Sequence, residues 1–327
     1  MSCCVKVFTM DKFNYRLGLY EKAMPDFSEW EKKLELTKSS GFDWMEVSID
    51  ETDKKLSRLD SAQTVRELKA AISAVGVPVH TMCLSGHRKY PLGSHDEKTR
   101  LAGLDIMKKA LELSCEIGIR IIQLAGYDVY YESSDSDTAK YFAEGLAESV
   151  ALAAEYGVVL GFETMETPFL DTVKKGMRFV NGINSPYLGM YPDIGNLKNA
   201  AVIYNSDVVE DLKTGRGHIF AAHLKETAPG KYRDMEFGSG GHTEYVPCVK
   251  ELTAQGVRMF TGEFGITARK TTAKCSITPR RFSEKKLNRL QIAESKFRSS
   301  LWKFSHPNGL SLFSQTDLKI FQASEYI

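Results

Sequence analysis

Short apolar runs alternate with longer amphipathic segments along most of the chain, up to about residue 263. Runs of this kind that lie between turn residues are typical of strands buried in a sheet. We predict eight strands, at residues 16–19, 43–47, 77–82, 120–124, 158–163, 188–193, 219–224 and 258–263. The nearly continuous apolar character of runs such as 119–122 indicates parallel strands that are covered on both faces.

The segments between these runs repeat apolar residues at helical spacing. We predict seven helices, at residues 26–39, 62–75, 96–117, 137–156, 170–183, 207–213 and 244–253. Several of them end just before a glycine, such as Gly76, Gly118 and Gly157, which can supply the left-handed residue that closes a helix. An eighth helix is expected in the tail, because Leu287, Leu290 and later apolar residues recur every three to four positions within 281–304.

Eight strands with interleaved helices predict a (β/α)8 TIM barrel of the α/β class, in a single domain. A doubly wound sheet is the structural alternative, since strand order cannot be derived from the pattern. We expect the barrel to occupy residues 1–264 and an atypical basic segment to occupy 265–327.

Charge is distributed unevenly along the 327 residues. The whole chain has 43 Lys+Arg and 42 Asp+Glu, but residues 265–327 contain 12 basic and 4 acidic residues. The near-neutral total argues against general nucleic-acid affinity. It is, however, an average over a tail with a charge of +8 and a body with a charge of −7.

The six cysteines form no CxxC pair, which predicts a reduced, cytoplasmic protein. We find no apolar core of a secretory signal near the first residue and no apolar run of membrane-spanning length, which excludes the membrane-protein class.

The candidate chemistry lies at the ends of the last four predicted strands, which finish at Glu163, Asp193, His223 and Glu263. In a barrel these ends meet at one rim, where functional side chains gather. Each acid alone could be a helix N-cap. Together, three carboxylates would repel one another unless a cation were present, and three carboxylates with one imidazole match Mn²⁺, Mg²⁺, Co²⁺ or Zn²⁺. Glu163 and Glu263 come from strands three positions apart, so they can face each other across a small substrate.

The sequence resembles a known family over residues 15–263. The matching segments are 17–23 (LGLYEKA), 48–53 (SIDETD), 82–85 (MCLS), 90–94 (YPLGS), 123–131 (QLAGYDVYY), 191–197 (YPDIGNL), 217–219 (GHI) and 223–230 (HLKETAPG). They are similar to the L-ribulose-5-phosphate (L-xylulose-5-phosphate) 3-epimerases of L-ascorbate catabolism, in the xylose-isomerase-like TIM barrel superfamily.

The resemblance implies an isomerase that epimerises a ketopentose 5-phosphate at C3 with a divalent metal held by Glu163, Asp193, His223 and Glu263. It also implies that Glu163 and Glu263 carry the protons, one removing the C3 proton to leave a cis-enediolate and the other returning a proton to the opposite face. The partner is then a small sugar phosphate, with no nucleic acid and no membrane, and a homo-oligomer remains open.

Seven further residues are expected at the substrate. Glu46 is a hydrogen-bonding candidate near the sugar, with a simple surface acid as the alternative, and Gln123 is a candidate for orienting a hydroxyl or a metal ligand. Lys225 and Arg233, together with the small residues Gly238, Ser239 and Gly240, follow His223 and could contact the phosphate. His80, His87 and Arg88, near the third strand, are weaker phosphate candidates.

After residue 264 the resemblance stops, and the tail is either a lineage-specific extension or a segment translated in a different frame. Three other functions stay open: an aldose–ketose isomerase of the same superfamily, a non-catalytic sugar-phosphate binder, and nucleic-acid binding by the tail. A metal-dependent DNA-repair endonuclease is disfavoured, because its zinc sites need more histidines than this rim offers, and the chain has only 7.

Overall fold

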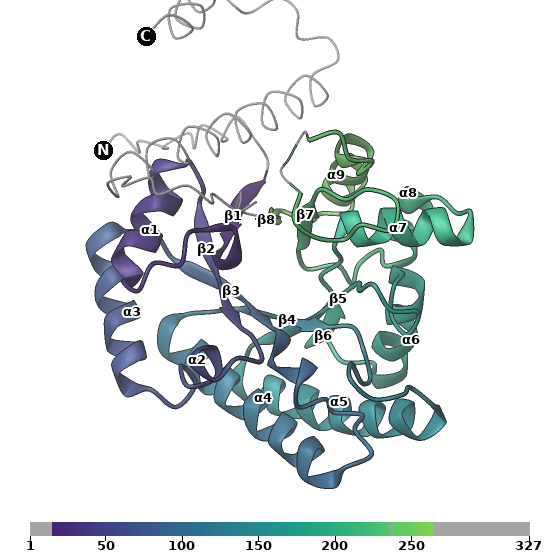
Figure 1. Cartoon of the computed structure of the whole chain (residues 1–327), viewed down its shortest axis with the longest axis horizontal. Helices are drawn as coiled ribbons and strands as arrows, with labels where there is room; N and C mark the ends of the chain where they lie inside the picture. Colours follow the sequence, from purple (N-terminus) through teal and green to yellow (C-terminus); the bar gives the residue numbers. More distant parts are fainter. Residues whose placement is uncertain (1–14, 236, 238, 265–327) are drawn as a thin grey trace, which may run out of the picture.

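The computed structural model describes residues 15–235, 237 and 239–264. Eight parallel strands surround a central axis and helices cover them on the outside (Figure 1). The strands are β1 Arg16–Tyr20, β2 Trp44–Ile49, β3 Val79–Leu84, β4 Ile121–Ala125, β5 Val159–Glu163, β6 Leu188–Met190, β7 Ala222–Lys225 and β8 Met259–Glu263. All eight predicted strands are therefore present, most of them displaced by one to three residues.

The strands pair in the order β6-β5-β4-β3-β2-β1-β8-β7. The circle closes between β6 and β7 through isolated parallel bridges, Met190 with Ile219 and Asp193 with His223. The backbone N–H of Met190 donates to the carbonyl of His218 at 2.7 Å, and that of His223 donates to the carbonyl of Pro192 at 2.9 Å. A closed ring excludes the doubly wound alternative, and the TIM barrel prediction is confirmed.

The outer helices follow the strands in the alternation that a barrel requires. They are α1 Trp30–Ser39, α2 Asp53–Leu56, α3 Ala62–Val75, α4 Glu97–Ile117, α5 Ser136–Tyr156, α6 Val173–Ile183, α7 Ile194–Tyr204, α8 Val208–Thr214 and α9 Tyr245–Ala254. Two short 3-10 turns, η1 Glu21–Ala23 and η2 Ser85–Arg88, follow β1 and β3 directly. Helix α1 begins four residues later than predicted.

Helix α7 is absent from the sequence prediction. Its first turn contains Gly195 and Asn196 after Pro192, a composition typical of a loop. The structure shows why the helix forms there: the carboxylate of Asp193 accepts hydrogen bonds from the backbone N–H groups of Gly195 and Asn196, both at 2.8 Å. A side-chain cap of this kind satisfies the unpaired donors of a first helical turn.

Strand β2 illustrates how the barrel separates its apolar and polar interiors. All six of its side chains are buried. Met45, Val47 and Ile49 belong to the main apolar core between strands and helices. Because side chains alternate along a strand, Glu46 and Ser48 point into the barrel instead. The barrel thus carries polar groups inward, toward the rim where the candidate chemistry lies.

Residues 265–327, with the helix expected within 281–304, lie outside the described residues. The boundary at residue 264 therefore stays a prediction. Among the helices of the described residues, none is long and apolar enough to cross a bilayer.

Candidate active site

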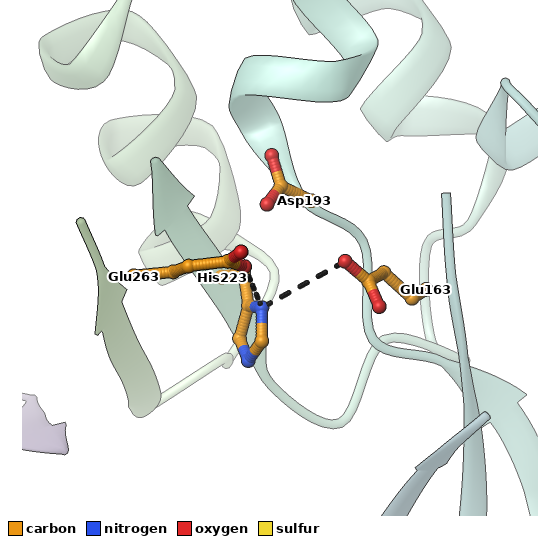
Figure 2. Close-up of side chains that lie close together, drawn as sticks. All are labelled: Glu163, Asp193, His223 and Glu263. Carbon is orange, nitrogen blue, oxygen red and sulfur yellow. Dashed lines mark hydrogen bonds and ion pairs between the residues drawn. The ribbon is translucent and has the colours of Figure 1, made fainter. Parts of the chain in front are cut away.

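Four side chains converge inside the C-terminal rim of the barrel (Figure 2). They are the set expected from the strand ends, namely Glu163 on β5, Asp193 after β6, His223 on β7 and Glu263 on β8. Each offers one ligand atom, and these atoms all lie within 4.8 Å of one another. Within the described residues this is the only such group of His, Cys, Asp and Glu side chains.

The imidazole of His223 lies at the base of the cluster. Its Nδ1 is 2.9 Å from Oε2 of Glu263 and 3.9 Å from Oε1 of Glu163. Figure 2 shows the two glutamates approaching from opposite sides, with Asp193 on the side away from the imidazole. The geometry agrees with the expectation that the two glutamates can face each other across a small space.

Asp193 lies three residues beyond the last residue of β6, so the prediction that it ends a strand is wrong. It is the N-cap of α7, and its Oδ1 accepts both capping hydrogen bonds. The capping role and a ligand role are compatible, because Oδ2 remains directed toward the cluster, where the ammonium group of Lys225 lies 3.0 Å away.

Lys225 is the cation that belongs to this cluster. Its side chain is buried at the end of β7, and its Nζ also lies 3.7 Å from Oε1 of Glu263. Burial alone would lower the pKa of Lys225, but Asp193, Glu263 and Glu163 together raise it above its ordinary value. Lys225 is therefore charged and offsets part of the negative charge of the carboxylates.

The two glutamates differ in their affinity for a proton. Burial, with a contribution from Glu263, raises the pKa of Glu163 to about 8, although His223 and Lys225 act in the opposite direction. Burial would also raise the pKa of Glu263, but Lys225 and the hydrogen bond from His223 lower it to about 2. Neighbouring carboxyl groups with separated proton affinities are typical of acid–base pairs.

Glu46 does not lie at a strand end, and it is not a surface acid. It is in the middle of β2 and fully buried below the cluster. Its Oε1 lies 2.5 Å from Nε2 of His223, and its Oε2 accepts a hydrogen bond from the hydroxyl of Tyr191 at 2.8 Å. Glu46 therefore contacts the imidazole from the side opposite to the other acids.

Gln123 is also fully buried, on β4. Its amide nitrogen donates to the carbonyl of Tyr191 at 3.5 Å, whereas no hydrogen bond forms to its Oε1. Gln123 is not among the residues that line the rim cavity. Its expected role in orienting a hydroxyl or a ligand stays a prediction.

A cavity opens above the cluster and shows which other side chains surround it. The cavity is lined by Tyr20, Lys22, Cys83, Ser85, Arg88, Ala125, Glu163, Met165, Glu166, Asn196, Lys225, Tyr232, Arg233 and Glu263. Lys225 and Arg233 were expected there. Ser239 and Gly240 are exposed and do not line it, and Gly238 lies outside the described residues.

Sequence reasoning missed Tyr20, Lys22 and Ser85 as cavity residues. They end β1 or lie within two residues after β1 and β3, and a position near a strand end is the same signal that identified the three acids and the histidine. Arg88 lines the cavity as well, whereas His80 lies near the start of β3 and His87 is buried with its Nε2 donating to the carbonyl of Gly103. His80 and His87 therefore do not line the cavity.

The four converging residues suit a divalent cation. Three carboxylates and one imidazole are ligands for hard and borderline divalent ions, and the atoms lie close enough to share one ion. Without a cation, burial and mutual repulsion raise the pKa values of Glu163 and Asp193, which is the electrostatic cost that a bound ion would remove.

Comparison with known proteins decides the family. The family model described as xylose isomerase-like TIM barrel matches residues 34–273. The chain is 44% identical over 241 residues to L-ribulose-5-phosphate 3-epimerase UlaE of Shigella boydii serotype 18, covering 73% of this chain and 83% of that protein. The same identity and coverage hold for UlaE of Escherichia coli O157:H7.

The chain belongs to the xylose isomerase-like TIM barrel family, together with these 3-epimerases. It is an enzyme of the isomerase class.

Two solved structures share the fold at low sequence identity. An L-ribulose 3-epimerase superposes with a TM-score of 0.70 at 18% identity, over 92% of this chain and 99% of that one. The IOLI protein with a bound zinc atom superposes with a TM-score of 0.67 at 18% identity, over 88% of this chain and 99% of that one.

Proposed function

We propose that the enzyme interconverts L-xylulose 5-phosphate and L-ribulose 5-phosphate by metal-dependent epimerisation at C3. The observation that carries the proposal is the convergence of Glu163, Asp193, His223 and Glu263 in a barrel that is 44% identical to L-ribulose-5-phosphate 3-epimerases. Two glutamates on opposite sides of one small site are what inversion at a single carbon requires.

Glu163, Asp193, His223 and Glu263 would hold the divalent ion, through Nδ1 of the imidazole and one oxygen of each carboxylate. When bound, such an ion would polarise the C2 carbonyl of the open-chain ketose and acidify the C3 proton. Mn²⁺, Mg²⁺, Co²⁺ and Zn²⁺ all match this donor set.

Glu163 and Glu263 would carry the proton between the two faces of C3. One carboxylate takes the C3 proton and leaves a cis-enediolate, and the other donates a proton to the opposite face, with the roles exchanged in the reverse direction. The two carboxyl groups are not equivalent: in the metal-free site burial raises the pKa of Glu163, whereas Lys225 and His223 lower the pKa of Glu263, and a difference in proton affinity supports the assignment of an acid and a base.

The remaining cavity side chains would bind the sugar phosphate. Lys225 lies against the metal-site carboxylates and is placed to contact oxygens near the reacting carbon. Lys22, Arg88 and Arg233 line the same cavity, and Ser85 Oγ and Arg88 Nε are buried without a hydrogen-bond partner. Cations and unpaired donors favour a phosphate group there, rather than at the exposed residues Ser239 and Gly240.

Hydrogen exchange at C3 tests the proposal directly. The purified, metal-loaded protein is incubated with L-xylulose 5-phosphate in deuterated water, with and without EDTA, and the products are analysed by NMR. We expect deuterium at C3 and formation of L-ribulose 5-phosphate, both abolished by EDTA and restored by added Mn²⁺. Deuterium at C1 would identify an aldose–ketose isomerase instead, and binding without exchange would identify a non-catalytic sugar-phosphate binder.

A further inference from the structure

Beneath the four converging residues, the barrel contains a second, fully buried set of polar side chains. Glu46, Tyr191 and Thr261 are all completely inaccessible to solvent. The hydroxyl of Tyr191 donates to Oε2 of Glu46 at 2.8 Å and lies 2.7 Å from the hydroxyl of Thr261. Burying polar groups inside the barrel costs free energy unless each one is paired, so the presence of three of them here suggests a role.

The role follows from the contact with His223. Glu46 Oε1 lies 2.5 Å from Nε2 of the imidazole, across 177 residues of chain. The other nitrogen, Nδ1, faces Glu163 and Glu263 (Figure 2). A carboxylate can only accept from an imidazole N–H, so Glu46 holds a proton on Nε2. Without a metal ion, Nδ1 is hydrogen-bonded to Glu263 at 2.9 Å, and a bound ion would take Nδ1 in place of that hydrogen bond.

The orientation of the carboxylate is fixed as well. One oxygen of Glu46 is held by the Tyr191 hydroxyl. The ring of Tyr191 packs edge-on against the imidazole of His223, with ring centroids 5.2 Å apart. The other oxygen is then directed at Nε2. Carboxylate–histidine–metal arrangements of this type raise the basicity of the ligand nitrogen and hold the ring in one orientation.

We infer that Glu46 is a positioning residue for the metal ligand His223, held in place by Tyr191, and not a residue that contacts the sugar. Two observations separate it from the substrate: it does not line the rim cavity, and the imidazole lies between it and the other acids. The inference rests on the proposed function, since it assigns a part of the same metal site.

Metal affinity, and not turnover alone, tests this role. Titration calorimetry with Mn²⁺ compares the wild-type protein with E46Q, which keeps the shape and an acceptor but removes the charge, and with E46L, which removes the acceptor. Loss of such a supporting partner typically weakens metal binding 10- to 100-fold, so we expect E46Q to bind about tenfold more weakly and E46L up to about 100-fold more weakly.

The matched control is V47A, the next residue on β2, whose buried side chain belongs to the apolar core on the other face of the strand. It should lower the thermal midpoint while leaving Mn²⁺ affinity unchanged. If E46L does not fold, Y191F provides the second test, because it removes the hydroxyl that orients Glu46 and should weaken Mn²⁺ binding by a smaller factor than E46Q.

A spectroscopic readout distinguishes positioning from general support of the core. In ¹⁵N-histidine-labelled, Zn²⁺-loaded protein, long-range ¹H–¹⁵N correlation should show His223 protonated at Nε2, and this signal should shift in E46Q but not in V47A. Equal Mn²⁺ affinity in wild type, E46Q and Y191F would overturn the inference and leave the proposed function intact. Failure of the wild-type protein to bind any divalent ion would overturn both.

Discussion

The ammonium group of Lys225 lies 3.0 Å from Oδ2 of Asp193, on the carboxylate whose other oxygen caps helix α7. A positive charge thus occupies the edge of the site that we propose for a cation. Lys225 offsets the charge of the carboxylates when the metal is absent, and it would repel the metal when both are present.

This relationship predicts opposite effects of one substitution. K225M should bind Mn²⁺ more tightly, by roughly tenfold, because a like charge a few ångströms from the ion is removed. The same variant should lose at least about 100-fold in kcat/KM, because it removes the contact to the substrate oxygens that we propose for Lys225. Calorimetry and steady-state kinetics check the two parts, with K225R as the charge-retaining control. Weaker Mn²⁺ binding in K225M would contradict the argument.

Replacement of Glu163 or Glu263, the proton carriers that we propose, should stop C3 exchange. We expect E163Q and E263Q each to lower the exchange rate by at least about 10³-fold, because each removes an acid–base group as well as a candidate metal ligand. E166Q changes a glutamate that lines the same cavity outside the metal-ligand group, and its rate should fall by less than about tenfold. Metal content is measured for every variant, so that loss of the ion is separated from loss of proton transfer. Persistent exchange in either catalytic variant would rule out its assigned role.

The start of helix α7 tolerates no side chain at Gly195. A Cβ atom there would lie 2.6 Å from the carbonyl oxygen of Lys225 and 3.2 Å from Oδ1 of Asp193. We expect G195A to displace both residues, lower the thermal midpoint and weaken Mn²⁺ binding at least tenfold. G182A, in helix α6, meets no atom within 4 Å and should be neutral or stabilise the protein by up to about 1 kcal/mol. Unchanged metal affinity in G195A would show that the helix start does not position Asp193.

A buried cluster of charges supports the rim next to β1. The carboxylate of Glu21 accepts from Arg58 at 2.8 Å and lies 2.5 Å and 2.7 Å from the ammonium groups of Lys33 and Lys55. Burial opposes ionisation of Glu21, but the three cations lower its pKa well below the ordinary value. E21Q would leave three cations without their partner and should cost about 3–5 kcal/mol of unfolding free energy.

The sign of the pH dependence follows from the lowered pKa. The stabilisation from Glu21 is fully present above the pKa of the unfolded chain, about 4.3, and is lost as the pH falls toward the folded-state value. The difference in unfolding free energy between wild type and E21Q should therefore shrink below about pH 4. E29Q, which removes a surface ion pair with Lys32, is the control and should leave stability unchanged. A difference that stays constant from pH 7 to pH 3 would contradict the prediction.

His87 should make the free energy of unfolding depend on pH in a higher pH range than Glu21 does. Burial lowers its pKa to about 4, although its hydrogen bond to the carbonyl of Gly103 acts in the opposite direction. The unfolded chain takes up this proton near pH 6.5, so stability falls as the pH drops from about 6.5 to 4, by up to about 3 kcal/mol. Urea unfolding at several pH values compares wild type with H87Q, which lacks the titrating group. Parallel curves for the two proteins would show that His87 does not titrate in this way.

The order of elements and the chemistry of the rim are determined by the sequence alone. Strand periodicity, glycine caps and the acidic or imidazole residues after successive strands are local signals, and they identified the barrel and the set Glu163, Asp193, His223 and Glu263. Asp193 was predicted to end a strand and instead caps helix α7, because a helix cap and a strand end have similar sequences. Helix α7 was not predicted, because its first turn has the composition of a loop.

Only the tertiary structure decided what lies behind and around those residues. Glu46 and His223 are 177 positions apart, and no local pattern indicates that an acid in the middle of a strand will meet an imidazole through the barrel interior. The same holds for Lys225, whose charge is paired with Asp193 at the start of α7 and with Glu263 on β8, and for Tyr20, Lys22 and Ser85 at the cavity. Contacts of this kind arise from closure of the ring, which sets the inward face and the height of every strand at once.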